Sequence, residues 1–265
     1  MKNLLIELLI AVFFTSCSTS STLMQSIMYG DDGLSESEVI QGLKTALDIG
    51  TDKAVNLVSD PDGYLMDQAI KIMLPPELNK VINDLREAPG GEQIYNATVK
   101  PVIEDLIVAI NRSASDAATS AVPIFKEAIK EMTIQDGYAI LKGDYKNAGK
   151  RSATRYFQDK TSDDLSNLFE PSIDASLSKP LVGNTSAIVI WDKFLKAYNA
   201  VQKSPANFLM KLEPVNEPDL SAYVTDKALD GLFVKIADEE QEIRDDPYKY
   251  ANDIIKKVFG EDSLK

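Results

Sequence analysis

Apolar residues recur every three or four positions along most of this chain, and this spacing restricts its fold more than any other feature. In the first run, apolar residues at positions 39, 40, 43, 46 and 47 share one helical face, and Ser35 with Glu38 forms a capping-box pattern before them. Similar runs continue to residue 260, whereas the alternating runs typical of strands are few. The sequence therefore predicts an all-α fold with one multi-helix domain over residues 35–260.

Helix-start and helix-stop residues divide this domain into segments. Thr133 with Asp136 predicts the start of a short helix, and Thr161 with Asp164 predicts the start of another. Pro171 predicts an interruption of that second helix, because proline lacks the N–H group that a helix interior needs.

The C-terminal part of the domain carries similar signals. Asp219 predicts the cap of a long helix that reaches Arg244, and Pro247 predicts the start of a last helix that ends at Gly260. The paired prolines in IKIMLPPEL, residues 70–78, predict an extended or loop segment there.

The N-terminus reads as a secretory leader. A positive start at Lys2 precedes the apolar run LLIELLIAVFF, which at about a dozen residues is shorter than the roughly 20 that a membrane-spanning helix needs. We therefore expect a signal peptide over residues 1–16, a flexible tether over residues 17–34 and a short tail over residues 261–265.

The small residues Thr15 and Ser16 before Cys17 resemble the lipobox of bacterial lipoproteins, in which the cysteine is lipidated and becomes the first residue. An ordinary signal peptide with a free thiol is the alternative. We expect lipidation at Cys17, so that the protein is anchored in the bacterial cell envelope, faces the periplasm and contacts the membrane through its lipid. The outer membrane is favoured over the inner one.

The net charge of the chain limits the classes of partner that it can bind. The net charge is −13, and removing the leader with Lys2 and Glu7 leaves it unchanged. Nucleic acid would be repelled on average, so we expect an envelope protein or a small ligand as partner and no nucleic acid.

The chain contains no histidine, and Cys17 is its one cysteine. This composition excludes disulfides within a monomer, zinc sites with histidine or cysteine ligands, and Ser-His-Asp or Cys-His catalysis within the chain. Only carboxylates, lysine, tyrosine, serine or a metal held by oxygen ligands remain for catalysis, and the sequence indicates no cofactor.

One carboxylate stands on an apolar helical face. Apolar residues at positions 229, 232, 233 and 236 form this face, Glu240 occupies its next place, and Ile243 continues it. A buried carboxylate needs a partner, and the candidates are Arg244, four residues later, and Arg155 in a separate segment. We expect a structural ion pair rather than a functional site, with Glu239 and Glu242 facing water.

A metal site is a less favoured alternative at Asp60 and Asp62, in the stretch SDPDGYLMD. The spacing resembles the middle of an EF-hand loop, but its first and last ligand positions fall on Val58 and Ala69, which offer no side-chain oxygen. A plain turn at Pro61-Asp62-Gly63 is the preferred interpretation, and no metal is expected.

Five segments together resemble one bacterial family. They are PDGYL, IFKEAIKEMTIQDGYAILKGD, ATRYFQDKTSDDL, YVTDKALDGLFVKIADEEQEIRDDP and KKVFG. In order and spacing they are similar to the "domain of unknown function 4197" family of helical envelope proteins, over most of residues 35–260. The chain differs at Gly137, where the family tends to carry alanine, and in a longer stretch around residues 173–184. The resemblance implies a helical fold and an envelope location but assigns no activity.

The expected role is therefore a non-enzymatic interaction or ligand-binding module of the cell envelope. The alternative is a hydrolase that uses carboxylates, with or without a divalent metal. An enzyme should gather acids with perturbed titration in one cleft, whereas a binding module should show an apolar patch or groove.

Overall fold

The computed structural model describes residues 35–87, 90–182, 185–205, 207–211, 214 and 219–260. Within these residues most of the chain is helical, and the only strands are two very short antiparallel ones, β1 (Pro180–Val182) and β2 (Thr185–Ser186). The prediction of an all-α fold is confirmed. The expected leader, the tether with Cys17 and the tail at residues 261–265 lie outside the described residues.

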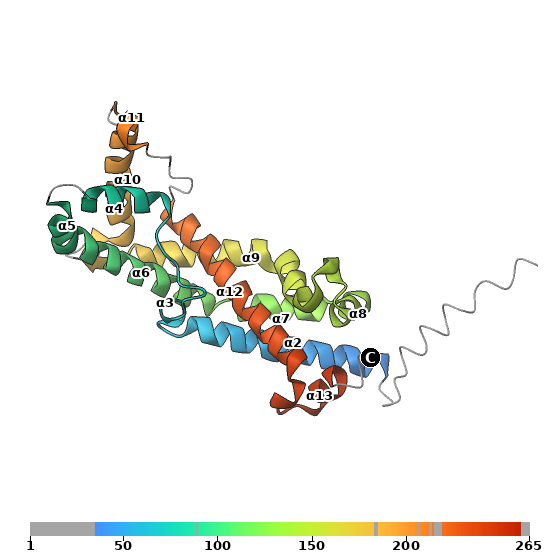
Figure 1. Cartoon of the computed structure of the whole chain (residues 1–265). Helices are drawn as coiled ribbons and strands as arrows, with labels where there is room; N and C mark the ends of the chain where they lie inside the picture. The colour runs from blue at the N-terminus through green and yellow to red at the C-terminus, as the bar shows by residue number, and fades with distance from the viewer. Residues whose placement is uncertain are drawn as a thin grey trace, which may run out of the picture.

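Three long helices form the centre of the domain: α2 (Glu36–Ser59), α9 (Ser152–Leu177) and α12 (Leu220–Asp245). The helix α12 packs against both α2 and α9 (Figure 1), so two of its faces are buried. A fourth long helix, α6 (Lys100–Ala118), packs beside α9. Among the described residues, no helix has both the length and the apolar character needed to cross a bilayer.

The shorter elements complete the chain. In order they are α3 (Gly63–Met66), α4 (Glu77–Glu87), α5 (Gly91–Ile94), η1 (Tyr95–Val99), α7 (Val122–Glu131), α8 (Ile134–Lys142), η2 (Tyr145–Asn147), η3 (Gly149–Arg151), α10 (Ala187–Gln202), α11 (Asn207–Met210), η4 (Pro247–Lys249) and α13 (Asp253–Phe259). Figure 1 shows α4, α5, α10 and α11 at one end of the elongated domain, and α8 and α13 toward the other.

The first helix begins where its local signals predict. The Ser35 N–H donates to Glu38 Oε2 at 2.8 Å, and the Glu38 N–H donates to Ser35 Oγ at 3.3 Å. These two bonds satisfy backbone donors that a helix N-terminus leaves unpaired. The Thr133–Asp136 box does the same for α8.

The helix α9 is longer than the sequence predicts, and the predicted helix start at Thr161 and Asp164 is wrong. Thr161 lies inside α9, where its hydroxyl donates to the Phe157 carbonyl at 2.7 Å. Pro171 does not interrupt the helix either. The apolar residues at positions 165, 169, 173 and 177 are almost fully buried along one face of α9, and this packing outweighs the hydrogen bond that the proline removes.

The end of the domain also differs from the prediction. Pro247 begins only the 3₁₀ turn η4, and the last helix, α13, begins after Asn252, whose side chain accepts two N–H groups of the first turn. The helix still ends at Gly260, as predicted. It packs closely on α2, because a Cβ atom at Gly42 would lie only 2.5 Å from Val258 Cγ2.

The predicted extended segment lies between α3 and α4 and is held by side chains. The Asn111 amide, fully buried on α6, exchanges two hydrogen bonds of 2.8 Å with the backbone N–H and carbonyl of Ile72. The Tyr223 hydroxyl donates to the Met73 carbonyl at 2.8 Å. This segment is thereby fastened to α6 and α12 and leads directly into α4.

Candidate functional site

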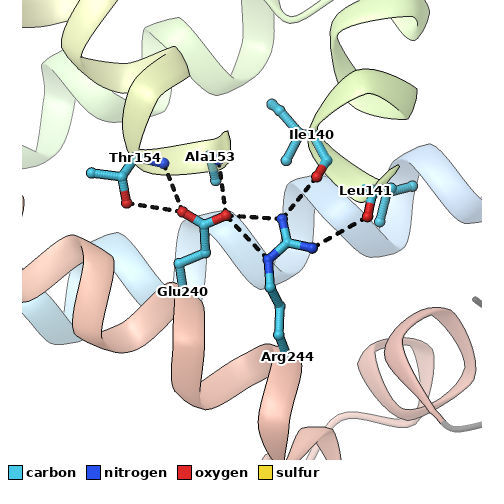
Figure 2. Close-up of polar contacts among 6 residues, drawn as sticks. All are labelled: Ile140, Leu141, Ala153, Thr154, Glu240 and Arg244. Atoms are coloured by element: carbon cyan, nitrogen blue, oxygen red, sulfur yellow. Dashed lines mark hydrogen bonds and ion pairs between the residues drawn. The ribbon is translucent and has the colours of Figure 1, made fainter. Parts of the chain in front are cut away.

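Glu240 lies on a buried face of α12, and its carboxylate caps the N-terminus of α9 (Figure 2). Its Oε1 accepts the Ala153 N–H at 2.9 Å, and its Oε2 accepts the Thr154 N–H at 2.8 Å and the Thr154 hydroxyl at 2.9 Å. The first N–H groups of a helix have no partner within it, and their partial positive charge favours a carboxylate. Glu240 therefore completes the first turn of a distant helix.

Arg244 follows one turn later and caps the C-terminus of α8 (Figure 2). Its Nη2 and Nη1 donate to the carbonyls of Ile140 and Leu141 at 2.8 Å and 3.2 Å, and its Nη2 and Nε donate to Glu240 Oε1 at 2.8 Å and 3.1 Å. The last carbonyls of a helix carry partial negative charge, which favours a cation. The two side chains of α12 thus join the ends of α8 and α9.

The pair is closed to solvent and to substrate. The side chains of Glu240 and Arg244 are 5% and 11% exposed. Both carboxylate oxygens and all three guanidinium nitrogens already have protein partners, so neither group is free to act on a bound molecule. The arrangement favours the structural interpretation of this pair over a catalytic one.

Arg155, the other candidate partner, does not meet Glu240. Its guanidinium turns along α9 toward Asp159, with 3.5 Å between Nη2 and Oδ1, and its side chain is 49% exposed. Backbone N–H groups of α9 donate to Glu240, in place of the Arg155 side chain that the sequence suggested as a partner. With Arg151, Arg155 lines an open hollow of about 550 Å³ between α9 and α12.

The prediction that Glu239 faces water is wrong. The residue is 5% exposed, and its Oε2 lies 2.7 Å from Lys53 Nζ and accepts the Tyr250 hydroxyl at 3.1 Å. Lys53 also lies 2.6 Å from Oε2 of Glu242, which pairs in turn with Lys249. Glu239 is buried because α2 covers the second face of α12, whereas the sequence indicated only one buried face.

This cluster shifts the pKa values of several of its members. Hydrogen bonds from Lys249 and Lys53 lower the pKa of Glu242 to about 2. Burial, followed by the charge of Glu239, raises the pKa of the Tyr250 hydroxyl. At neutral pH Tyr250 therefore keeps its proton and donates it in a hydrogen bond, while Glu242 stays ionised. The cluster fastens α2 and η4 to α12.

The acids near the predicted turn lie beside an open hollow of about 640 Å³, which Asp60, Asp62 and Asp67 line together with Lys235. Two of the three acids are paired: Asp62 lies 3.0 Å from Arg112, and Asp67 lies 2.7 Å from Lys235. The hydrogen bond from Lys235 lowers the pKa of Asp67, the opposite of what a general acid needs. Within the described ranges, no three Asp, Glu, His or Cys residues are grouped so that they could hold a metal ion.

A different kind of site lies at the far end of the domain, where α4, η1, α6 and α10 enclose a cavity of about 230 Å³. Its lining residues are Leu74, Leu78, Ile82, Thr98, Val99, Val102, Ile103, Leu106, Ile190, Trp191 and Phe194. Ten of these eleven side chains are apolar. None of the residues predicted as functional contributes to this cavity.

The cavity has a buried floor and an accessible rim. Leu78, Leu106 and Trp191 are buried, whereas Thr98 is exposed and most other lining residues are half-buried. The Trp191 ring stacks on Phe194, with 6.0 Å between ring centroids and 21° between planes. Such a pair stabilises this wall by about 0.5–1.5 kcal/mol beyond the burial of its surface.

The wall beside Thr98 contains the π-helical turn η1, in which the Lys100 N–H bonds to the carbonyl of Tyr95, five residues earlier. Pro101 follows directly, and its ring would collide with the Ala97 carbonyl in a regular α-helix. The wider π turn relieves this collision. π-Helical turns are rare in proteins, and many of those that are found lie at functional sites.

The chain matches a family model described as "Protein of unknown function (DUF4197)" over residues 33–260, a range that includes all described residues. This chain belongs to the DUF4197 family. The family resemblance found in the sequence is thereby confirmed. No curated protein and no solved structure matches this DUF4197 chain.

The structure explains the glycine at the position where the resemblance indicates alanine. A Cβ atom at Gly137 of this DUF4197 protein would lie 2.6 Å from Ile40 Cδ1 and 3.3 Å from Leu43 Cδ2. The contacts are made by the ends of flexible side chains on α2. The glycine therefore lets α8 approach α2 closely in this member of the family.

The sequence did not indicate the cavity. The available signal for it was a group of apolar residues around Pro101 that lie beyond the buried face of α6. These residues are Val99, Val102 and Ile103, and all three are half-buried. Whether three helices close completely over such residues depends on how they pack, and packing is not visible in one helix at a time.

Proposed function

We propose that this DUF4197 protein is a non-enzymatic ligand-binding protein of the bacterial cell envelope, held by a lipid on Cys17 and facing the periplasm. The cavity between α4, α6 and α10 carries the proposal. It combines an almost wholly apolar lining with an accessible rim, which is the usual character of a site that binds an apolar group.

The location rests on the sequence. The leader, the lipobox-like residues before Cys17 and the polar tether favour an anchored, exported protein, with the outer membrane preferred. The net charge of −13 makes contact with the membrane through the lipid more favourable than contact through the protein surface.

The alternative, a hydrolase that uses carboxylates, has less support. Glu239, Glu240 and Glu242 are bonded to helix ends or to lysines, and they line neither the apolar cavity nor the open hollows beside Asp62 and Arg155. Of the three acids that share one hollow, Asp62 and Asp67 are paired with cations. Binding is therefore the function that the arrangement of side chains supports best.

Fluorescence titration with N-phenyl-1-naphthylamine, an uncharged dye that brightens in apolar surroundings, tests this function. The full chain with Cys17→Ala is used, so that no detergent competes for the site. We expect saturable binding that Val102→Phe weakens at least tenfold, because the larger side chain fills the cavity. Leu168→Phe, on an exposed part of α9 outside the cavity, should bind normally. Equal binding by all three chains would contradict the proposed function.

A further inference from the structure

We infer that the cavity between α4, α6 and α10 takes a linear acyl chain of about eight carbons, held with its polar end at Thr98. This inference rests on the proposed function and adds the chemical class of the ligand. It follows from the chemistry of the cavity floor, from the cavity volume and from the charge of the protein.

The floor excludes polar groups from the inner end of the ligand. Leu78, Leu106 and Trp191 form it, and each is at most 4% exposed. A ligand hydroxyl, amide or carboxylate placed against the apolar faces of these side chains would give up its hydrogen bonds to water. The inner part of the ligand must therefore be hydrocarbon.

The volume limits the size of that hydrocarbon. The cavity measures about 230 Å³. An apolar cavity of roughly 150 Å³ already stays dry and binds benzene, and at about 30 Å³ for each water-sized group the present cavity has room for on the order of eight methylene groups. A fused-ring lipid or a helix of a partner protein is too large to enter.

The rim and the overall charge select the polar end. Thr98 is the one polar residue of the lining and is exposed, so the head of the ligand lies there in contact with water. The protein carries a net charge of −13, which repels a free carboxylate. An uncharged acyl ester or a zwitterionic lipid therefore suits the site better than a free fatty acid.

Displacement of the same dye by 1-monoacylglycerols of 6, 8, 10 and 12 carbons tests the inference on the full Cys17→Ala chain. Each methylene that enters the cavity should raise affinity about fourfold, and the increase should stop near eight carbons, where further methylenes stay in water. Octanoate should compete less well than monooctanoylglycerol, and added salt should narrow this difference.

Two cavity-filling variants from different helices, Val102→Phe and Ile190→Phe, should each weaken monooctanoylglycerol at least tenfold, with Leu168→Phe as the matched control. Thermal unfolding shows whether each variant is folded. If only one of the two cavity variants folds, that variant alone is sufficient to test binding in the cavity. Affinity that does not depend on chain length, or that both variants leave unchanged, overturns the inference. If the dye binds in the cavity but monoacylglycerols do not displace it, the acyl class is wrong and the proposed function stands. If the dye does not bind either, both are wrong.

Discussion

Arg244 Nη2 lies 2.8 Å from Glu240 Oε1, and through this contact two side chains of one helix close the ends of two others. Glu240 holds the N-terminus of α9, and Arg244 holds the C-terminus of α8. The pair is buried, yet every polar atom that it brings inside meets either its partner or an unpaired backbone group. A buried ion pair of this kind is costly to break from one side only.

Glu240→Ala should therefore destabilise the domain strongly. The substitution leaves Arg244 without its carboxylate and two N–H groups of α9 without acceptors, so we expect a loss of about 3–5 kcal/mol in the free energy of unfolding. The adjacent Gln241 is exposed, and Gln241→Ala should cost less than about 0.5 kcal/mol. Urea denaturation followed by circular dichroism measures both values. Similar stability in the two variants would show that the helix ends do not depend on Glu240.

The stability of the domain should fall in acid, in part through Glu242. Its pKa is lowered to about 2 in the folded protein, against about 4.3 in an unfolded chain. The contribution of Glu242 is therefore complete above about pH 4.5 and is lost as the pH falls toward 2. Because the side chain is 29% exposed, we expect this contribution to be on the order of 1 kcal/mol.

Glu242→Gln measures this contribution directly. The variant should be less stable than the wild type at pH 7, and the difference should shrink between pH 4.5 and pH 2. Thermal unfolding at several pH values provides the comparison. A difference that stays constant over this range would mean that the lysine contacts do not depend on the charge of Glu242.

Two glycines should respond oppositely to alanine. At Gly231 in α12, a Cβ atom would lie 2.7 Å from the ring of buried Tyr64, and we expect Gly231→Ala to destabilise the domain by about 1–3 kcal/mol. At Gly137 the obstacle is only the terminal Cδ1 atom of Ile40, which a side-chain rotation can displace, and alanine favours a helix interior by up to about 1 kcal/mol. Gly137→Ala should therefore be neutral or stabilising in thermal unfolding. If Gly137→Ala destabilised the domain more than Gly231→Ala, the less adaptable contact would be the one between α8 and α2.

Cys17→Ala should remove the membrane anchor. If Cys17 carries the lipid, the variant should lose incorporation of radiolabelled palmitate in cells and should move from the membrane fraction to the soluble fraction. Ser18→Ala, one residue later, should leave both properties unchanged. A Cys17→Ala variant that remains in the membrane fraction would place the anchor elsewhere in the chain.

The sequence predicted the elements whose signals are local. The Ser35–Glu38 and Thr133–Asp136 boxes mark the starts of α2 and α8, because each box is formed by residues three positions apart. Thr161 carries the same pattern and yet lies inside α9. The side chain that caps the first turn of α9 is Glu240, 86 positions beyond Thr154, and no local pattern contains it.

The candidate sites show a similar division. The pairing of Glu240 with Arg244 follows from their spacing in one helix. The burial of Glu239 does not, because it depends on α2 lying over a second face of α12. The apolar cavity depends on the packing of α4, α6 and α10 together, which single-helix periodicity does not determine.

The link between Glu240, Arg244 and the ends of α8 and α9 also makes two earlier helices depend on a helix that is synthesised much later. A ribosome makes α8 and α9 first, and their caps arrive 86 to 104 residues later. A chain cut short before α12 would therefore leave the C-terminus of α8 and the N-terminus of α9 without these two caps.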